Sequence, residues 1–369
     1  MALVKLFALD VCMVEGQSMW RTLEGKPSNS AVDRRSDWVL VDKLTSRFSQ
    51  PDRLAICVFR QKGELSVKRL VGLPGETIDF RGGDVFVTRD GGDPVRLVRP
   101  ADLIEAQRVP VPAGEQAAPI LQGTGPSQAD GDGTIWKPRP DQTLTVYVRY
   151  GAGSDSRCIT DDYFVVDDRS PKGRVAPGRH AVPDVRVTVG SLAVGSGTIA
   201  FIHEIGLGEL RRITVSAAGI DVSARSGGPE SVRSRHPGVS AGPGLRFETI
   251  DGLFRVSLRA GEAWRELYSE PRDTEHHEGF SGVRFEVAGG PVRVGPLEVA
   301  RDVHYVWGAE RPAGERPVPI PPDRMFLVGD NPEISTDSRS DDIGPVPVGA
   351  LVGVVRAIIL PWSRKRFPR

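Results

Sequence analysis

The chain has 369 residues, a length that allows two domains and a sizeable core. Its 48 lysines and arginines balance its 48 aspartates and glutamates, so charge gives no reason to expect nucleic acid or an acidic membrane as a partner. The 42 glycines, the 30 prolines and the shortage of long helical patterns indicate a mainly β protein.

The first 90 residues read as short strands. Residues 6–14 predict a strand that leads into a loop around Ser18, and a Gly-Gly pair at 82–83 predicts a hairpin over residues 79–88. Lys68 lies in an alternating apolar run before a Gly-Leu-Pro-Gly turn, which predicts a lysine at a strand end. Further β-type runs occupy residues 38–44, 53–60 and 65–71.

The remainder divides into three stretches. Residues 97–160 are rich in Pro, Gly, Ala, Gln and Asp around one strand-like run at 143–149, and predict a loop or crossover. Short alternating runs separated by Gly-containing turns then fill residues 161–310 and predict an antiparallel sandwich or jelly roll. Residues 311–369 supply a final set of strands.

The three cysteines, Cys12, Cys57 and Cys158, cannot all pair within one chain, and we expect free thiols. The sequence has no stretch of about 18 uninterrupted apolar residues, the length that a spanning helix needs. The apolar N-terminus is broken by Lys5 and Asp10, and it lacks the small-residue cleavage site of a secretory signal.

Lys68 and Ser18 are the candidate chemical pair. A lysine in apolar surroundings loses hydration of its charged form, so its pKa falls and the neutral amine can act as a general base. Such a base needs a nucleophile, and Ser18 lies between an apolar strand and a polar loop. Taken singly, Lys68 reads as a snorkelling side chain and Ser18 as a turn serine.

Three sequence segments, read in order, favour the chemical interpretation of Ser18 and Lys68 over the ordinary one. Residues 16–22 read Gly-Gln-Ser-Met-Trp-Arg-Thr, residues 68–76 read Lys-Arg-Leu-Val-Gly-Leu-Pro-Gly-Glu, and residues 329–339 read Gly-Asp-Asn-Pro-Glu-Ile-Ser-Thr-Asp-Ser-Arg. Together they resemble the three motif boxes of the type I signal peptidases, the Ser-Lys serine peptidases that remove secretory signal peptides. The resemblance covers residues 10–90 and 320–362.

The resemblance implies a signal-peptidase-like β catalytic fold that carries an inserted β-sandwich or jelly-roll domain. The expected division is residues 1–96 as the first part of the catalytic domain, 97–160 as the crossover, 161–310 as the inserted domain, and 311–369 as the completion of the catalytic domain.

The resemblance also assigns roles. It makes Ser18 the nucleophile, with its backbone N–H in the oxyanion hole, and Lys68 the general base. It makes Ser335 the hydroxyl that orients the lysine, and Asp337 with Arg339 an ion pair that stiffens the loop behind it. The ordinary alternatives are a turn hydroxyl and a surface ion pair of small value. The other matched supporting positions are Met19, Gly329, Asp330 and Asn331.

Several positions depart from the family pattern. Arg21 stands where a proline is usual, and Trp20 precedes it. Glu76 replaces an aspartate, and Pro332 stands where arginine is frequent. Gly16 leaves no side-chain donor two residues before the serine. These changes bear on substrate preference more than on the Ser-Lys pair.

The implied activity is cleavage of signal peptides from exported preproteins after Ala-x-Ala, at the extracytoplasmic face of a cell membrane, with peripheral membrane contact and without cofactor, metal or nucleic acid. One alternative is an inactive relative that binds a peptide or partner. Another is a soluble self-cleaving regulator, for which Ala-Gly pairs at 113–114, 152–153 and 218–219 are candidate bonds. The His276-His277 pair has no metal-site spacing.

Overall fold

The computed structural model describes residues 8–26, 36–111, 120–149, 157–167, 170–206, 208–272, 279–307 and 316–368. The chain divides into two compact units. Unit 1 comprises residues 1–108, 163–174 and 303–369, and unit 2 comprises residues 109–162 and 175–302. Each unit has its own buried apolar core.

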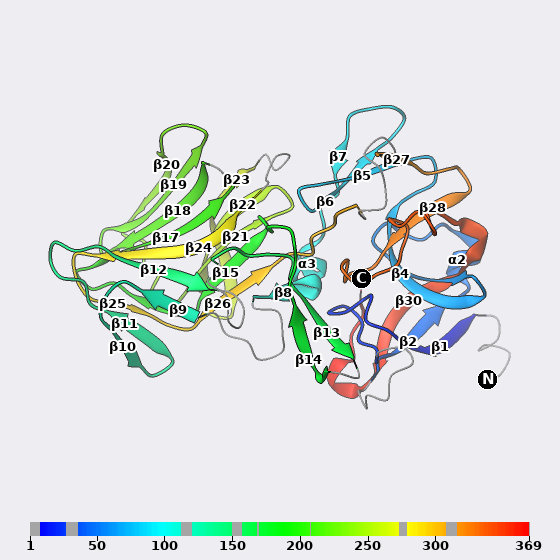
Figure 1. Ribbon diagram of the computed structural model, residues 1–369, viewed down its shortest axis with the longest axis horizontal. Helices are drawn as coiled ribbons and strands as arrows, with labels where there is room; N and C mark the ends of the chain where they lie inside the picture. The colour runs from blue at the N-terminus through cyan, green and yellow to red at the C-terminus, as the bar shows by residue number, and fades with distance from the viewer. Residues whose placement is uncertain are drawn as a thin grey trace. The chain divides into compact units, whose positions relative to one another are not determined.

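The main sheet of unit 1 has seven strands and mixes the two ends of the chain. In sheet order they are β1 (Leu9–Met13), β2 (Trp38–Asp42), β30 (Leu351–Leu360), β3 (Ile56–Gln61), β4 (Glu64–Gly72), β28 (Arg324–Val328) and β29 (Val346–Pro347). The strand nearest the C-terminus, β30, pairs antiparallel with both β2 and β3. In Figure 1 this red strand lies among the blue strands of the N-terminal segment.

The described residues of unit 1 also form a four-stranded sheet, a two-stranded hairpin and four short helices. The sheet, in order, is β27 (Val318–Pro319), β5 (Thr77–Arg81), β6 (Asp84–Thr88) and β7 (Val95–Arg96). The hairpin is β13 (Tyr163–Asp167) with β14 (Ser170–Ala176), whose last two residues belong to unit 2. The helices are α2 (Thr45–Phe48), α3 (Ala101–Gln107), η2 (Val348–Ala350) and η3 (Trp362–Arg364).

The described part of unit 2 forms three antiparallel sheets. The largest runs β20 (Ser231–Pro237), β19 (Gly219–Ser226), β18 (Glu209–Ser216), β17 (Thr198–Ile205), β24 (Ser281–Ala288), β12 (Leu144–Arg149) and β9 (Ile120–Gly123). A six-stranded sheet runs β23 (Ala263–Pro271), β22 (Leu253–Ala260), β21 (Leu245–Ile250), β15 (Val185–Val189), β26 (Leu297–Arg301) and β8 (Val109–Pro110). The third runs β10 (Ser127–Asp130), β11 (Gly133–Trp136), β25 (Val292–Val294) and β16 (Leu192–Ala193).

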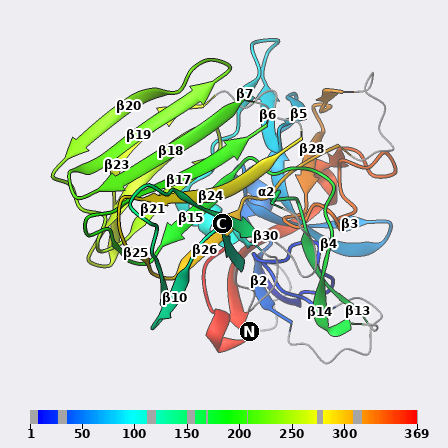
Figure 2. The same cartoon turned by 60° about the vertical axis from the view of Figure 1, so that its left-hand side comes forward.

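Side-chain alternation explains the sandwich of unit 2. Successive residues of a strand point to opposite faces, so every second residue can enter a core. In β18, for example, Ile213 and Val215 are buried and the residue between them is half-buried. Phe201, Phe247 and Phe285 pack within the same apolar cluster, with ring centroids 5.7 to 6.0 Å apart. Figure 2 shows β17 to β20 side by side in the large sheet.

The mainly β fold expected from the sequence is confirmed, but two local expectations are wrong. Residues 97–160 contain α3 and strands β8 to β11 where the composition indicates a loop, while the strand-like run at 143–149 is confirmed as β12. These strands are short, and they form because β9, β10 and β11 find partners in β12 and β25, which no local pattern reveals. Lys68 lies in the middle of β4 and not at its end, because pairing with β3 continues from Glu64 to Arg69.

The three cysteines are free thiols, and of these Cys57 is fully buried while Cys12 and Cys158 are half-buried. No helix within the described ranges has both the length and the apolar character to cross a membrane.

Candidate active site

The Ser18 hydroxyl and the Lys68 amine meet in unit 1. Ser18 follows β1 in a turn, and Lys68 extends from β4, so the sheet brings together residues that are 50 positions apart. Lys68 Nζ lies 2.7 Å from Ser18 Oγ and 3.2 Å from the carbonyl oxygen of Val67. When the amine is neutral, this contact allows the Ser18 O–H to donate its proton to Nζ.

Burial tunes the lysine. Lys68 is 7% exposed, and this desolvation lowers its pKa from the ordinary value of 10.5. The carboxylates of Asp337 and Asp330 oppose that effect, and the Arg339 guanidinium reinforces it. The net direction is toward a neutral amine, which is the form that can accept a proton.

The third motif segment holds the serine loop through its backbone. The Asn331 N–H donates to the Ser18 carbonyl at 2.9 Å, and the Asn331 side-chain amide donates to the Gln17 carbonyl at 3.2 Å. Among the described residues, none accepts a hydrogen bond from the Ser18 N–H. The Ser18 N–H is therefore available as a donor to a negatively charged oxygen beside Ser18 Oγ.

Gly329 allows this close approach. A Cβ at this position would lie 2.2 Å from Ser335 Oγ and 2.5 Å from the Ser18 carbonyl oxygen. Only a residue without a side chain fits between the serine loop and Ser335.

Ser335 lies beside the site without bonding to the lysine. Its Oγ is buried and has no hydrogen-bond partner among the described residues. The two contacts of the Lys68 amine go to Ser18 and Val67 instead. The orienting role that the family resemblance implies for Ser335 stays a prediction.

Asp337 and Arg339 form a buried ion pair. The Asp337 carboxylate accepts from Arg339 Nε and Nη2, both at 2.9 Å, and from the Gly329 N–H at 2.8 Å. Their side chains are 1% and 7% exposed, so the alternative of a surface pair is wrong. Through Gly329, the pair fixes the loop that lies against Ser18.

The sequence analysis did not predict a second buried ion pair, between Arg69 and Asp330. Arg69 donates to Asp330 at 2.8 and 2.6 Å, with side chains 1% and 0% exposed, and the Gln107 amide of α3 adds a donor at 2.8 Å. Arg69 directly follows the lysine, so alternation turns it to the opposite face of β4. The pair joins the lysine strand to the loop of Asn331. The sequence feature that could have indicated this pair is the Lys68-Arg69 dipeptide of the second motif segment.

Two further positions have structural roles. Met19 is 1% exposed and packs in an apolar cluster with Leu23 and Ile56, so the protein core and not a substrate pocket contains its side chain. Arg21 adopts φ +80°, a left-handed conformation that proline cannot reach because its ring fixes φ near −65°. The backbone just after Ser18 therefore differs from one that has proline at this position.

The family comparison decides the relationship. The family described as "Signal peptidase, peptidase S26" matches residues 1–170 and 269–362, which is more than half of the chain. The chain belongs to this S26 family. The matched ranges contain both members of the Ser18–Lys68 pair and the whole of the Gly329 to Arg339 segment. They leave residues 171–268 unmatched, in agreement with an insertion.

Other comparisons are distant. A comparison with curated proteins gave no match. Among solved structures, the chain is similar to the CBM2 module of the evolved Dit of Lactobacillus casei BL23 phage J-1, with 6% identity, 50% of this chain and 82% of that chain covered, and a TM-score of 0.32. It is also similar to a legume lectin-like domain from Entamoeba histolytica, with 11% identity, 48% and 88% covered, and a TM-score of 0.31.

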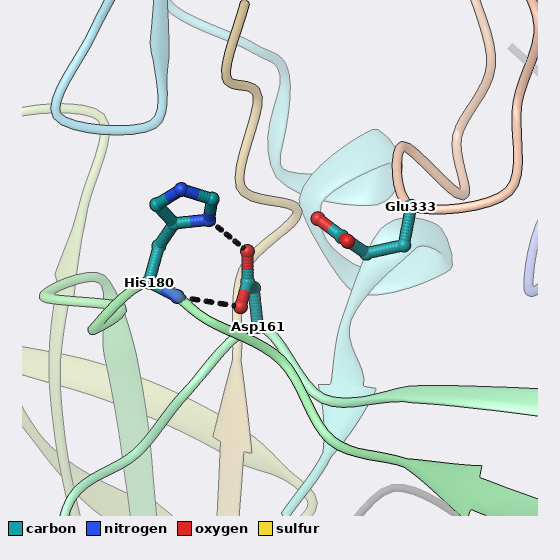
Figure 3. A group of neighbouring side chains, drawn as sticks. All are labelled: Asp161, His180 and Glu333. Carbon is teal, nitrogen blue, oxygen red and sulfur yellow. Dashed lines mark hydrogen bonds and ion pairs between the residues drawn. The ribbon is translucent and has the colours of Figure 1, made fainter. Parts of the chain in front are cut away.

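Outside the Ser18–Lys68 site, Asp161 and His180 form a hydrogen-bonded pair. In unit 2 the buried Asp161 carboxylate contacts His180 Nδ1 at 2.7 Å and accepts from the His180 N–H at 2.9 Å (Figure 3). It also accepts from the Arg179 N–H at 2.6 Å. These bonds reach the carboxylate from a segment 18 and 19 residues further along the chain.

Proposed function

We propose that this S26 family member is a serine endopeptidase that cleaves signal peptides after small residues, with Ser18 as nucleophile and Lys68 as general base. The observation that carries the proposal is the 2.7 Å contact between Ser18 Oγ and the buried Lys68 Nζ. The neutral amine takes the hydroxyl proton as Oγ attacks the scissile carbonyl, and the resulting ammonium then protonates the leaving amine. Water hydrolyses the acyl-enzyme in the second half of the reaction.

The Ser18 N–H supports the proposal as the backbone donor for the tetrahedral oxyanion. The substrates would be exported preproteins, and the place of action the extracytoplasmic face of a cell membrane, as the family resemblance implies. The chain's own residues supply every group that this mechanism uses, and no cofactor enters it.

The test is cleavage of a fluorogenic peptide that ends its signal region in Ala-x-Ala, with lipid or detergent present. We expect activity in the wild type, and at least a thousandfold loss in both Ser18→Ala and Lys68→Ala, because each removes a member of one unit. The control is Lys137→Ala, an exposed lysine in unit 2, which should retain full activity. Folded wild type that cleaves neither this substrate nor a peptide library would overturn the proposal.

A second candidate is a peptide-binding relative without catalysis, and the left-handed Arg21 favours it. A changed backbone after the nucleophile could misplace the Ser18 N–H without affecting the Ser18–Lys68 contact. The same assay separates the two: the binding protein would hold the Ala-x-Ala peptide with unchanged affinity in Ser18→Ala and would release no product.

A further inference from the structure

Unit 2 contains a cavity on the outer face of its large sheet. It measures about 560 Å³, which lies within the range of small-molecule sites. The lining comes from the edge strand β9, its neighbour β12 (Figure 1) and the segments before Ile159 and Ser281. The lining residues are Gln122, Gly123, Thr124, Tyr147, Arg149, Arg157, Cys158 and Phe280.

Strand register puts the polar members on one face. Gln122 lies directly opposite Tyr147 in the β9–β12 ladder, and alternation places Arg149 on the same side of the sheet as Tyr147. Val146 and Val148, the residues on either side of Tyr147, are fully buried in the core on the other side. Gly123 also keeps to the core side, since a Cβ there would lie 2.2 Å from the Trp136 ring.

The cavity contains polar groups without partners. The Gln122 amide, the Tyr147 hydroxyl and the Arg157 guanidinium make no hydrogen bond or ion pair with any described residue. On the next strand of the same face, by contrast, Arg284 is paired with both Glu204 and Glu286. On this face the described residues therefore pair Arg284 on β24, whereas they give the Arg157 guanidinium at the cavity no hydrogen-bond or ion-pair partner.

The charge of the lining is positive. Its described residues include Arg149 and Arg157 and no carboxylate. The Arg157 guanidinium lies over the Tyr147 ring, 3.8 Å from its centroid. Stacking fixes the plane of a guanidinium and leaves its in-plane N–H donors available for a carboxylate.

We propose that this cavity binds an acidic saccharide, a sugar with a ring carboxylate. Arg157, with Arg149, takes the carboxylate, and the Gln122 amide with the Tyr147 hydroxyl takes ring hydroxyls as both donor and acceptor. The exposed part of the Phe280 ring offers an apolar surface to the sugar C–H groups. A neutral sugar leaves the Arg157 charge unmatched, so the carboxylate sets the specificity.

The test uses the full-length protein and calorimetric titration with digalacturonate and with N-acetylneuraminic acid. Galactobiose is the uncharged match, and a short peptide with a free C-terminal carboxylate is the second comparison. We expect at least one acidic sugar to bind, at least tenfold more tightly than galactobiose and than the peptide, with an affinity that falls as salt rises.

Variants locate the site. Arg157→Ala should weaken binding of the acidic sugar about tenfold or more, because a charge-assisted hydrogen bond is lost. The matched control is Arg265→Ala, which removes one exposed positive charge of unit 2 away from the cavity and should leave affinity unchanged. Bound sugar should also slow alkylation of Cys158, read by mass spectrometry, and leave that of Cys12 unchanged.

Absence of binding by both acidic sugars at millimolar concentration overturns the proposal, as does equal binding of galactobiose or an unaffected Arg157→Ala. Tighter binding of the peptide would assign the cavity to peptide carboxylates instead. Ser18→Ala should bind the sugar as the wild type does, so this result is independent of the peptidase proposal.

Discussion

Lys68 carries an amine in surroundings that favour its uncharged form, and this affects stability as well as chemistry. The unfolded chain holds the Lys68 proton up to about pH 10.5, whereas the folded chain releases it at lower pH because burial lowers the pKa. Between these two pKa values the unfolded state binds more protons. The free energy of unfolding therefore rises with pH across that window.

Replacing the lysine should remove this dependence. We expect Lys68→Met to raise the free energy of unfolding at pH 7 by on the order of 1 kcal/mol, since an apolar side chain has no charge to desolvate. We also expect the rise of stability with pH below 10.5 to flatten. Urea unfolding from pH 6 to 10 measures both the free energy of unfolding at pH 7 and its dependence on pH. The exposed Lys137→Met is the control, and an equal effect there would contradict the account.

Arg21 offers a second test at the scale of one residue. At φ +80°, glycine is free of the Cβ strain that alanine has, and proline is sterically excluded. We expect Arg21→Gly to be about 1 kcal/mol more stable than Arg21→Ala, and Arg21→Pro about 3 kcal/mol less stable. Alanine is the reference because all three variants lose the contact of Arg21 with the Trp20 ring. Chemical denaturation gives the order, and a stabilising proline would show that the loop is not left-handed.

At the scale of elements, the Arg69–Asp330 ion pair joins β4 to the loop after β28. Arg69 and Asp330 are almost inaccessible to water, so removing one partner leaves a buried, uncompensated charge. Although burial alone would raise the pKa of Asp330, the Arg69 charge and hydrogen bonds hold it below its ordinary 3.8. The stabilisation is thus present above pH 3.8 and is lost as pH falls through the folded-state pKa.

We expect Arg69→Met to cost about 3 to 5 kcal/mol of unfolding free energy, and Arg69→Met with Asp330→Leu to cost much less than the sum of the single changes. The comparison is Arg356→Met, which breaks a pair that is 45% and 14% exposed and should cost at most about 1 kcal/mol. Urea titrations at pH 7 give all four values. Strict additivity of the two buried changes would refute the coupling.

Some elements and contacts can be predicted from the sequence, and others cannot. The hairpin over residues 79–88 follows from its Gly-Gly turn and appears as β5 and β6, and the Ser18–Lys68 pair follows from motif order. β9 to β11 do not follow, because partners elsewhere in unit 2 define them. Gln107 could not be assigned either: it meets Asp330 across 223 positions of chain, and no pattern near α3 indicates that contact.

At the scale of the whole molecule, the two units have separate cores. Phe285 belongs to the apolar cluster of unit 2 and Phe326 to one of unit 1, and both are fully buried. Calorimetry should therefore resolve two transitions. Each Phe→Ala change should cost about 3 to 5 kcal/mol and lower one transition only, a different one for each variant. A single transition that shifts equally in both variants would mean that the cores unfold together.

The position of β30 in the main sheet has a consequence for synthesis of the chain. Ser18 and Lys68 leave the ribosome early, but residues 351–360 pair between β2 and β3 and place Val355 and Ile358 in the core around Met19. The strands of unit 2 are complete by residue 302, so the nascent chain can finish that unit first. Unit 1 closes only when the C-terminal strand arrives. Under the proposed function, peptidase activity would then begin only after residues 351–360 have joined the sheet, and earlier nascent chains would be inactive.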